Sequence, residues 1–388
     1  MAKLGEVCLI NPKSCTLRDD TEVSFIPMTK VGEHGEFDAS EIKNYSEVKK
    51  GFTNFQNGDI LFAKITPCME NGKGAIAHNM KNGIGFGSTE FHVLRPDTDK
   101  ITREWLYYLT TWKTFRKEAE RNMTGSAGQK RVPKTFLENY VVNLPDIDTQ
   151  KSENKILRKV DDLIFLRKQQ LSKLDELVKA RFVEMFGDFE FNPKEFPVYH
   201  LCELCDVGSS KRIYQEEQSI SGIPFLKVAD LNELIDTGKY SCSTFIPLER
   251  YEQLLHKELT PKENDILITS RGTLGKCYIV QSDDEFYFQD GMISWLSNLS
   301  TKVSSIYISY LFAQPYIQKQ IESLQAGSTV AYLSIAMLKK MNVILPPKKL
   351  QDDFATFVEH VDQQKQTVQQ SLEKLELLKK ALMQEYFG

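Results

Sequence analysis

The chain has 388 residues, of which 41% are hydrophobic and 26% charged, and its formal net charge is −4. This length allows two or three domains. The absence of an 18-residue apolar run argues against a membrane span. The small negative charge argues against nucleic-acid binding by the whole surface but allows a local basic face. The start lacks an apolar signal region and the seven cysteines are an odd number, which together favour reduced thiols and a cytoplasmic location.

Residues 1–147 are predicted to form a first globular unit of mixed α/β structure. The segments "DILFAKI" and "FHVLR" have the composition of strands, and an amphipathic helix is expected at about 103–119. A Gly-Ser loop, a short helix and a strand ending in Leu-Pro follow.

Residues 148–187 are predicted to form a long coiled-coil helix. The segment 151–187 contains no proline, and its single glycine is Gly187. Apolar residues recur at intervals of seven in the row Leu157, Ile164, Leu171, Val178 and Met185. A sustained heptad pattern predicts a coiled-coil seam.

The second half of the chain repeats the first. Residues 188–347 carry the matching segments "NDILITS" and "GMISWLS", an expected helix at about 304–324 and a second strand ending in Leu-Pro, and residues 348–388 carry a second heptad row. The offset between the halves varies from 197 to 206 in the globular parts but stays at 201 from each Leu-Pro pair to each Phe-Gly pair. Loops therefore tolerate length changes, whereas the helices keep register.

The predicted fold class is α+β, with two similar mixed α/β units separated by a long antiparallel intramolecular coiled coil in a dumbbell with pseudo-twofold symmetry. The two complete heptad rows occupy different heptad positions, which suits antiparallel pairing within one chain. Two unrelated amphipathic helices on separate cores are the alternative. Four basic residues interrupt the weaker rows and are expected to point outward: Arg167, Arg181, Lys365 and Lys379.

A search for catalytic chemistry finds no convincing site. The segment "SRGTLGKC" lacks the first glycine and the Mg²⁺-binding hydroxyl of a phosphate loop. Cys202 and Cys205 form a CxxC without a second ligand pair for zinc. The segment "PDTDK" places its two acids too close together for a nuclease site. We therefore expect no catalytic residue, metal or cofactor in this chain.

Loops that mix Lys or Arg with Ser, Thr, Asn, Gln and aromatic residues are the remaining functional signal. They occur in both halves, at 63–74 and 124–134 and at 208–215, 269–276 and 326–334. Such side chains suit contacts with phosphates and base edges. The helix from Leu157 to Met185 would be about 42 Å long, close to the separation of half-sites on one face of DNA, about 34–36 Å.

With these features the chain resembles the specificity (S) subunits of type I restriction–modification systems. The resemblance covers nearly the whole chain and rests on "GDILFAKITPCMENGKGAIA" at 58–77, "TGSAGQKRVPKTFLENYVVNLP" at 124–145, "NDILITSRGTLGKC" at 264–277 and "LKKMNVILPP" at 338–347. The segments "PDIDTQKSENKI" and "PPKKLQDDF" depart from the usual Pro-Pro…Glu-Gln start of the spacer. This departure affects the expected start of each helix.

The resemblance implies a non-catalytic subunit in which residues 1–147 and 188–347 are target-recognition domains and residues 148–187 and 348–388 are spacer helices. Each domain would read one half of a split, asymmetric target in double-stranded DNA. Two methyltransferase subunits with S-adenosylmethionine would dock on the chain, and motor–nuclease subunits with ATP and Mg²⁺ would join for cleavage.

The candidate DNA-contacting residues are polar or basic and lie in the loops described above. In the first half they are Lys64, Thr66, Asn71, Lys73, Ser126, Gln129, Lys130 and Arg131; in the second half they are Lys211, Arg212, Ser270, Arg271, Thr273, Lys276, Ser328, Thr329 and Tyr332. Two other functions stay open from the residues alone: a coiled-coil adaptor whose heads bind proteins, and an enzyme with a divergent active site. The adaptor predicts heads that ignore DNA, and the enzyme predicts metal or cofactor binding by the isolated chain.

Overall fold

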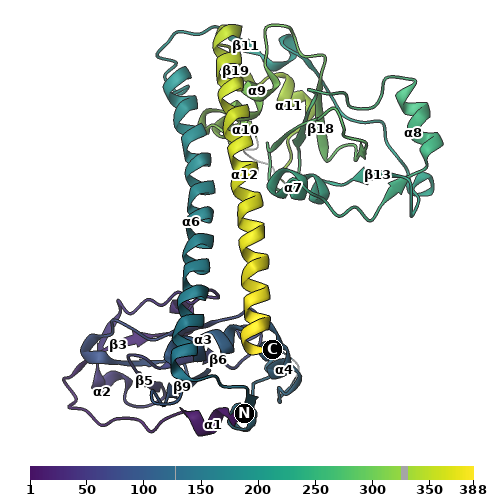
Figure 1. Ribbon diagram of the computed structural model, residues 1–388. Helices are drawn as coiled ribbons and strands as arrows, with labels where there is room; N and C mark the ends of the chain where they lie inside the picture. The colour runs from purple at the N-terminus through teal and green to yellow at the C-terminus, as the bar shows by residue number, and fades with distance from the viewer. Residues whose placement is uncertain (127, 325–330) are drawn as a thin grey trace. The chain divides into compact units, whose positions relative to one another are not determined.

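The computed structural model describes residues 1–126, 128–324 and 331–388 (Figure 1). The chain divides into two compact units: unit 1 comprises Met1–Gln169 and Gln369–Gly388, and unit 2 comprises Gln170–Val368. Two 40-residue helices, α6 (Ile147–Phe186) and α12 (Lys348–Phe387), each contribute one part to unit 1 and the other part to unit 2. The four domain ranges expected from the sequence remain a prediction.

Unit 1 contains two four-stranded sheets. In the first, the order is β2 (Cys8–Ile10), β9 (Phe91–Pro96), β6 (Ile60–Ala63) and β7 (Gly74–Ile76), with every pair antiparallel. In the second, the order is β4 (Ile42–Asn44), β3 (Glu22–Ile26), β8 (Ile84–Gly87) and β5 (Thr53–Gln56), and only β3 and β8 run parallel. A short pair joins β1 (Ala2–Lys3) to β10 (Val141–Val142).

Helices cover the first sheet of unit 1. They are α3 (Arg103–Thr111), α4 (Lys113–Arg121) and α5 (Lys134–Asn139), with the short α1 (Leu4–Val7) and, beside the second sheet, α2 (Tyr45–Val48). The main core joins β6 and β9 to α3, and Trp105 is 1% exposed. Phe387 packs on this tryptophan with ring centroids 4.7 Å apart, so the end of α12 is anchored in the same core.

Unit 2 repeats this plan with a different second sheet. Its main sheet has the order β12 (Asp206–Gly208), β18 (Ile293–Ser297), β15 (Ile266–Thr269) and β16 (Cys277–Ile279). The second sheet has the order β14 (Phe245–Ile246), β13 (Ile223–Leu226) and β17 (Tyr287–Phe288), and β11 (Val198–His200) pairs with β19 (Asn342–Ile344). The helices are α7 (Val228–Thr237), α8 (Leu248–Leu255), α9 (Ser305–Phe312), α10 (Pro315–Leu324) and α11 (Ile335–Lys339).

Each helix expected at 103–119 and 304–324 is divided in two. Trp112 has extended backbone angles (φ −61°, ψ 129°) and separates α3 from α4 while its side chain is buried. In unit 2, Pro315 begins α10 directly after α9 has ended. Proline lacks the amide hydrogen that a continuing helix requires, so a helix is interrupted before it. The amphipathic pattern of the sequence continues across this break and therefore does not show it.

Within each unit, α6 and α12 lie side by side and run antiparallel (Figure 1). In unit 1, Leu157 shares a core with Met383, and Lys379 pairs with Asp161 at 2.6 Å. In unit 2, Phe182 packs on Phe354 with ring centroids 5.3 Å apart. The expectation of an antiparallel pairing of heptad helices in an α+β fold is therefore confirmed.

The expected outward orientation of the basic residues on these helices is wrong for two of them. Lys365 pairs with Asp175 of α6 at 2.6 Å, and Lys379 pairs with Asp161 as described above. Arg181 also reaches α12, where its guanidinium lies 5.6 Å from the ring of Phe357. The acidic residues of the partner helix make inward orientation favourable, and the heptad pattern of a single helix does not show them.

Candidate nucleic-acid interface

Unit 1 brings two of the candidate loops together. The Val132 amide donates to the Lys64 carbonyl at 2.9 Å, and the Thr66 amide donates to the Lys130 carbonyl at 3.1 Å. Ile65 and Arg131 form the β-bridge between these two contacts. Because β6 ends at Ala63, the loop that leaves the central strand of the sheet is fixed beside the loop that follows α4.

Arg131 is fixed by an ion pair at this junction. Its Nε and Nη2 donate to the carboxylate of Glu90 at 2.9 and 2.8 Å, and its Nη1 donates to the Gln129 carbonyl at 3.0 Å. The Arg131 hydrogen bond lowers the pKa of Glu90, so the carboxylate stays charged at neutral pH. Arg131 is therefore engaged within the protein.

Arg116 holds the first loop from below. It is 7% exposed, and its guanidinium donates to the carbonyls of Thr110, Met69 and Lys73 at 2.8, 2.7 and 3.3 Å. Burial lowers the pKa of this guanidinium to about 10, still far above neutrality. Sequence reasoning missed Arg116, since a lone arginine in an amphipathic helix gives no sign that it binds carbonyls across the core.

His92 holds the second loop. It is 4% exposed, its Nε2 lies 2.8 Å from the Val132 carbonyl, and its Nδ1 lies 3.0 Å from the side-chain amide nitrogen of Asn11. Burial lowers the pKa of His92, with further lowering by Lys64 and Lys134. A neutral imidazole that donates from Nε2 and accepts at Nδ1 satisfies both contacts.

The remaining candidates of unit 1 differ in exposure. Asn71, Ser126, Gln129 and Lys130 are exposed, whereas Lys64, Thr66 and Lys73 are half-buried. The Lys73 ammonium donates to the Met28 carbonyl at 3.3 Å, and the Thr66 hydroxyl donates to the Gly128 carbonyl at 3.2 Å. The exposed group therefore lies on the loop tips, and the other three are tied to the framework.

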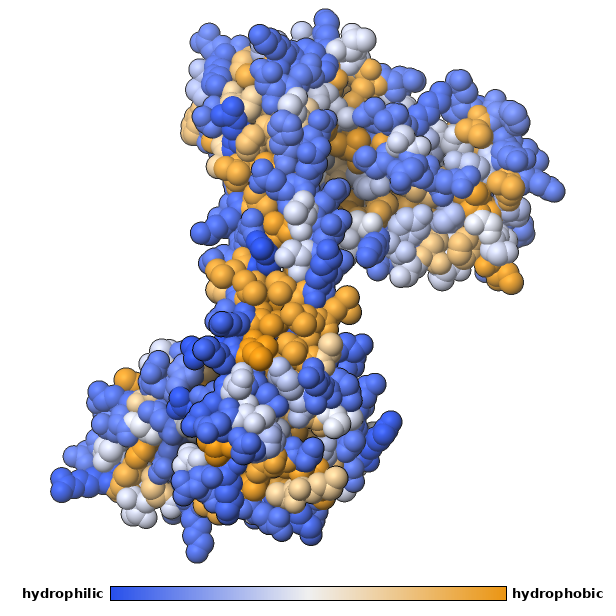
Figure 2. All heavy atoms as spheres, in the orientation of Figure 1, coloured by the Kyte–Doolittle hydropathy of each residue, from blue (hydrophilic) through white to orange (hydrophobic). Residues whose placement is uncertain are grey.

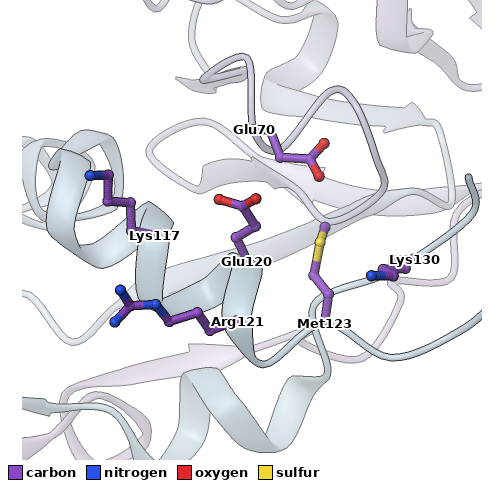
Figure 3. A pocket seen from close by; sticks show the side chains of 6 residues that line it. All are labelled: Glu70, Lys117, Glu120, Arg121, Met123 and Lys130. Carbon is purple, nitrogen blue, oxygen red and sulfur yellow. The ribbon is translucent and has the colours of Figure 1, made fainter. Parts of the chain in front are cut away.

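A hollow lies beside the exposed loop tips. Figure 3 shows the six side chains that line it, which come from the first loop, from α4 and from the second loop: Glu70, Lys117, Glu120, Arg121, Met123 and Lys130. Two acidic and three basic side chains therefore share this lining with one methionine. Sequence reasoning identified only Lys130 among these residues.

Unit 2 forms the same junction from equivalent positions. The Leu333 amide donates to the Ser270 carbonyl at 3.0 Å, and Arg271 and Tyr332 form the β-bridge. The Ser270 amide donates to the Met292 carbonyl at 2.9 Å, just as the Lys64 amide donates to the Glu90 carbonyl. The structural repeat therefore includes the candidate loops.

Ser270 is a correction to the candidate list. The residue is 1% exposed, and its hydroxyl lies 2.7 Å from the hydroxyl of Ser294 on the neighbouring strand. A hydroxyl that is buried and bonded within the sheet is unable to contact DNA. The loop sequence alone did not show that Ser270, directly after β15, is buried against Ser294 of β18.

The other candidates of unit 2 include two ion-paired residues. Lys276 pairs with Asp236 at 2.6 Å, and Arg212 pairs with Asp290 at 2.9 Å. The Lys211 amide donates to the Tyr287 hydroxyl at 2.8 Å, and the Lys211 side chain is exposed. Arg271 and Thr273 are exposed and Tyr332 is half-buried. Ser328 and Thr329 lie outside the described residues.

Within the described ranges, no group of three or more His, Cys, Asp or Glu side chains could hold a metal ion. In the same ranges, no helix is both long and apolar enough to cross a membrane. The arrangement offers loop tips with amide, hydroxyl and basic groups, supported by buried polar residues. Such groups are suited to recognition by hydrogen bonds and charge.

Comparison with known proteins places this arrangement in a family. The family model described as the type I restriction modification DNA specificity domain matches residues 1–176 and again residues 193–377. The chain belongs to this family. The two matches lie in the two repeated halves of the chain, so each half carries its own match to the DNA specificity domain.

Relatives of this family differ in how much of the chain they match. The EcoAI specificity subunit of a type I restriction enzyme from Escherichia coli is 46% identical over 178 residues, which are 44% of this chain and 30% of that subunit. A putative specificity subunit from Haemophilus influenzae is 25% identical over 327 residues, covering 81% of this chain and 76% of its own. The chain thus spans under a third of the length of the first curated relatives that it matches.

Solved structures support the fold. The S subunit of a type I restriction–modification system from M. genitalium aligns with a TM-score of 0.58 at 14% identity, covering all of this chain and 95% of that one. A chain from a structural study of type I R-M complex assembly and conformational transition aligns with a TM-score of 0.57 at 16% identity, covering 99% and 96%. At these identities the likeness concerns the fold.

Proposed function

We propose that this chain is the DNA sequence-specificity subunit of a type I restriction–modification complex and that it has no catalytic activity of its own. Unit 1 reads one half of a split, asymmetric target, and unit 2 reads the other. The observation that carries the proposal is the two-loop junction, which recurs in both units of a chain with two DNA specificity domains.

The loop tips are the proposed DNA contacts. Lys130 and Gln129 of unit 1 and Arg271 and Thr273 of unit 2 are exposed at equivalent junctions. Lysine suits phosphates, whereas glutamine and arginine suit adenine and guanine edges in the major groove. The half-buried Lys64 and Lys73 raise the local positive potential, and Lys73 also fixes the first loop through its bond to the Met28 carbonyl.

The paired helices set the spacing between the two half-sites. Lys365 and Lys379 of α12 lie 14 residues apart, and so do their partners Asp175 and Asp161 of α6. Two heptads on each helix therefore separate equivalent ion pairs, which fixes the antiparallel register. A fixed register makes the helix pair a ruler for the base pairs that neither unit reads.

The helix pair also carries the docking surface for methyltransferase subunits. Within unit 1, exposed apolar side chains occur on both helices: Leu163, Phe165, Leu166, Leu377 and Leu378. Phe165 and Leu377 are each 65% exposed, and Figure 2 shows hydrophobic atoms gathered on the helix pair next to the globular part of this unit. Contiguous exposed apolar surface of this kind marks protein interaction sites. S-adenosylmethionine, ATP and Mg²⁺ would belong to the partner subunits.

The test is to purify the full chain with its methyltransferase subunit and to map methylated adenines across a genome. The proposal predicts a motif of two short blocks separated by a fixed gap. A stable complex that methylates without such a motif would contradict the proposal. A complex that forms but does not bind DNA would favour a protein adaptor instead.

A further inference from the structure

The arginine at the two-loop junction stands on opposite loops in the two units. In unit 1 the bridge joins Ile65 to Arg131, so the arginine lies on the second loop. In unit 2 the bridge joins Arg271 to Tyr332, so the arginine lies on the first loop and an aromatic residue replaces Arg131. The two junctions therefore share a backbone but differ in chemistry.

A carboxylate neutralises the arginine in unit 1 but not in unit 2. Glu90 binds both nitrogens on one edge of the Arg131 guanidinium. Its structural equivalent in unit 2 is Met292, whose carbonyl accepts from Ser270 as that of Glu90 accepts from Lys64. Methionine carries no charge, so the acidic partner is missing from the second junction.

Arg271 is exposed and makes no ion pair or side-chain hydrogen bond with any described residue. Residues 127 and 325–330 contain no acidic side chain that could pair with it. Its guanidinium carbon lies 5.7 Å from the ring centroid of Tyr332. A cation–π contact of this kind favours a guanidinium position near the aromatic ring and leaves its N–H donors free.

The backbone that carries Arg271 is firmly held. The hydroxyl of the preceding residue, Ser270, is bonded to Ser294 inside the sheet, and the Leu333 amide binds the Ser270 carbonyl. A restrained backbone and a side chain that contacts an aromatic ring reduce the conformational entropy that binding would cost. Arg271 is thus preorganised for a directional contact. A lysine that binds phosphate by charge does not require such preorganisation.

We propose that Arg271, held on the face of Tyr332, reads a guanine in the half-site contacted by unit 2 and donates hydrogen bonds to its O6 and N7 atoms. Tyr332 acts as a positioning residue. Bidentate contact with guanine is the commonest base-specific contact of arginine in the major groove. This inference rests on the proposed function, and it assigns no equivalent role to Arg131, whose guanidinium is already held by Glu90 and by the Gln129 carbonyl.

The first experiment uses the wild-type complex of the full chain with its methyltransferase. Once the split motif is known, each guanine of the unit 2 half-site is replaced singly by 7-deazaguanine, which keeps base pairing but lacks the N7 acceptor. We expect one position at which the replacement weakens binding by up to about tenfold, as part of the roughly 5- to 150-fold effect of a full bidentate contact. Absence of such a position would overturn the inference.

Variants then connect that guanine to Arg271. In the Arg271→Ala complex, the 7-deazaguanine effect should disappear, and preference for guanine over other bases at this position should fall by roughly 5- to 150-fold. Tyr332→Leu should reduce the same preference, whereas Tyr332→Phe should retain it. Arg250→Lys, on α8 and paired with Glu217 at 2.9 Å, is the matched control and should leave the preference unchanged.

Protein stability, methyltransferase binding, DNA binding and the methylation motif together separate the possible results. Unchanged thermal unfolding and methyltransferase binding show that the variants are folded. Equal weakening on all DNA sequences would make Arg271 a phosphate contact and would overturn its role as a base reader. A wild-type complex without any split motif would instead contradict the proposed function itself.

Discussion

Gln150 and Gln351 make the same three hydrogen bonds at the first turns of the two long helices. Gln150 accepts from the Thr102 amide at 2.8 Å and donates to the carbonyls of Lys100 and Pro145, both at 2.9 Å. Gln351 accepts from the Ser304 amide at 2.9 Å and donates to the carbonyls of Lys302 and Pro346 at 3.0 and 2.7 Å. Both glutamines are fully buried, so in each unit one side chain fixes the start of the long helix to the globular part.

Replacing either glutamine should destabilise the protein. Gln150→Ala or Gln351→Ala leaves one amide and two carbonyls without their partner, and a buried unsatisfied polar group costs roughly 1–3 kcal/mol. We expect a loss of at least about 1 kcal/mol in the free energy of unfolding, measured with denaturant on the full chain. Gln364→Ala, at an exposed position of α12, should change it by less than about 0.5 kcal/mol. Equal effects at all three positions would contradict the proposed joint.

The ion pairs between the helices should be coupled. Asp175→Lys places a second lysine beside Lys365 and should lower the free energy of unfolding by roughly 1 kcal/mol. The double variant with Asp175→Lys and Lys365→Asp reverses both charges and should recover part of that loss. The pKa of Lys365 is raised because its bond to Asp175 and the nearby Asp362 outweigh the opposing effect of burial. Urea unfolding of the two single variants and the double variant measures the coupling. Strictly additive effects would show that this pair does not fix the register.

Acidification should destabilise unit 1 through His92. Burial lowers the pKa of His92 below its ordinary value, so between the folded and unfolded pKa values the unfolded chain binds more protons than the folded one. Stability therefore falls as the pH drops through about 6.5. His92→Gln should flatten this part of the curve of unfolding free energy against pH. An unchanged slope in the variant would exclude His92 as the cause.

Removal of the Glu90 carboxylate should strengthen binding to non-specific DNA. Glu90→Gln leaves Arg131 without its ionic partner, and an additional phosphate contact would steepen the slope of log K against log salt by about 0.9. The measurement is DNA binding over a salt series with a duplex that lacks the target motif. Asp99→Asn, which removes a carboxylate at an exposed turn of the same unit, serves as the control. A slope equal to that of wild type would contradict an available Arg131.

Periodicity and repetition allowed the long helices to be predicted because they are local properties of the sequence. Phe186 and Phe387 end equivalent helices, as the repeated Phe-Gly pairs indicated. The buried glutamines of the helix starts, in contrast, were not recognised. Their importance depends on backbone groups about 50 residues earlier in the chain, such as Lys100 and Lys302.

The candidate loops could be found from composition, but their internal chemistry could not. The sequence does not show that Ser270 is buried against Ser294, that Arg131 is bound by Glu90, or that Arg116 supports the first loop. Each of these facts depends on strands and helices that meet only in the folded unit. Lys130 and Arg271 remain the clearest proposed contacts, because both are exposed at the repeated junction.

The most direct test of the account is a domain exchange. Residues 1–147 are replaced by the corresponding segment of a specificity subunit with a known target, and methylated adenines are mapped for the complex with the methyltransferase. The account predicts that one block of the split motif changes while the other block and the gap stay the same. A change in both blocks, or in neither, in a complex that still methylates DNA would contradict the claim that each unit reads one half of the target.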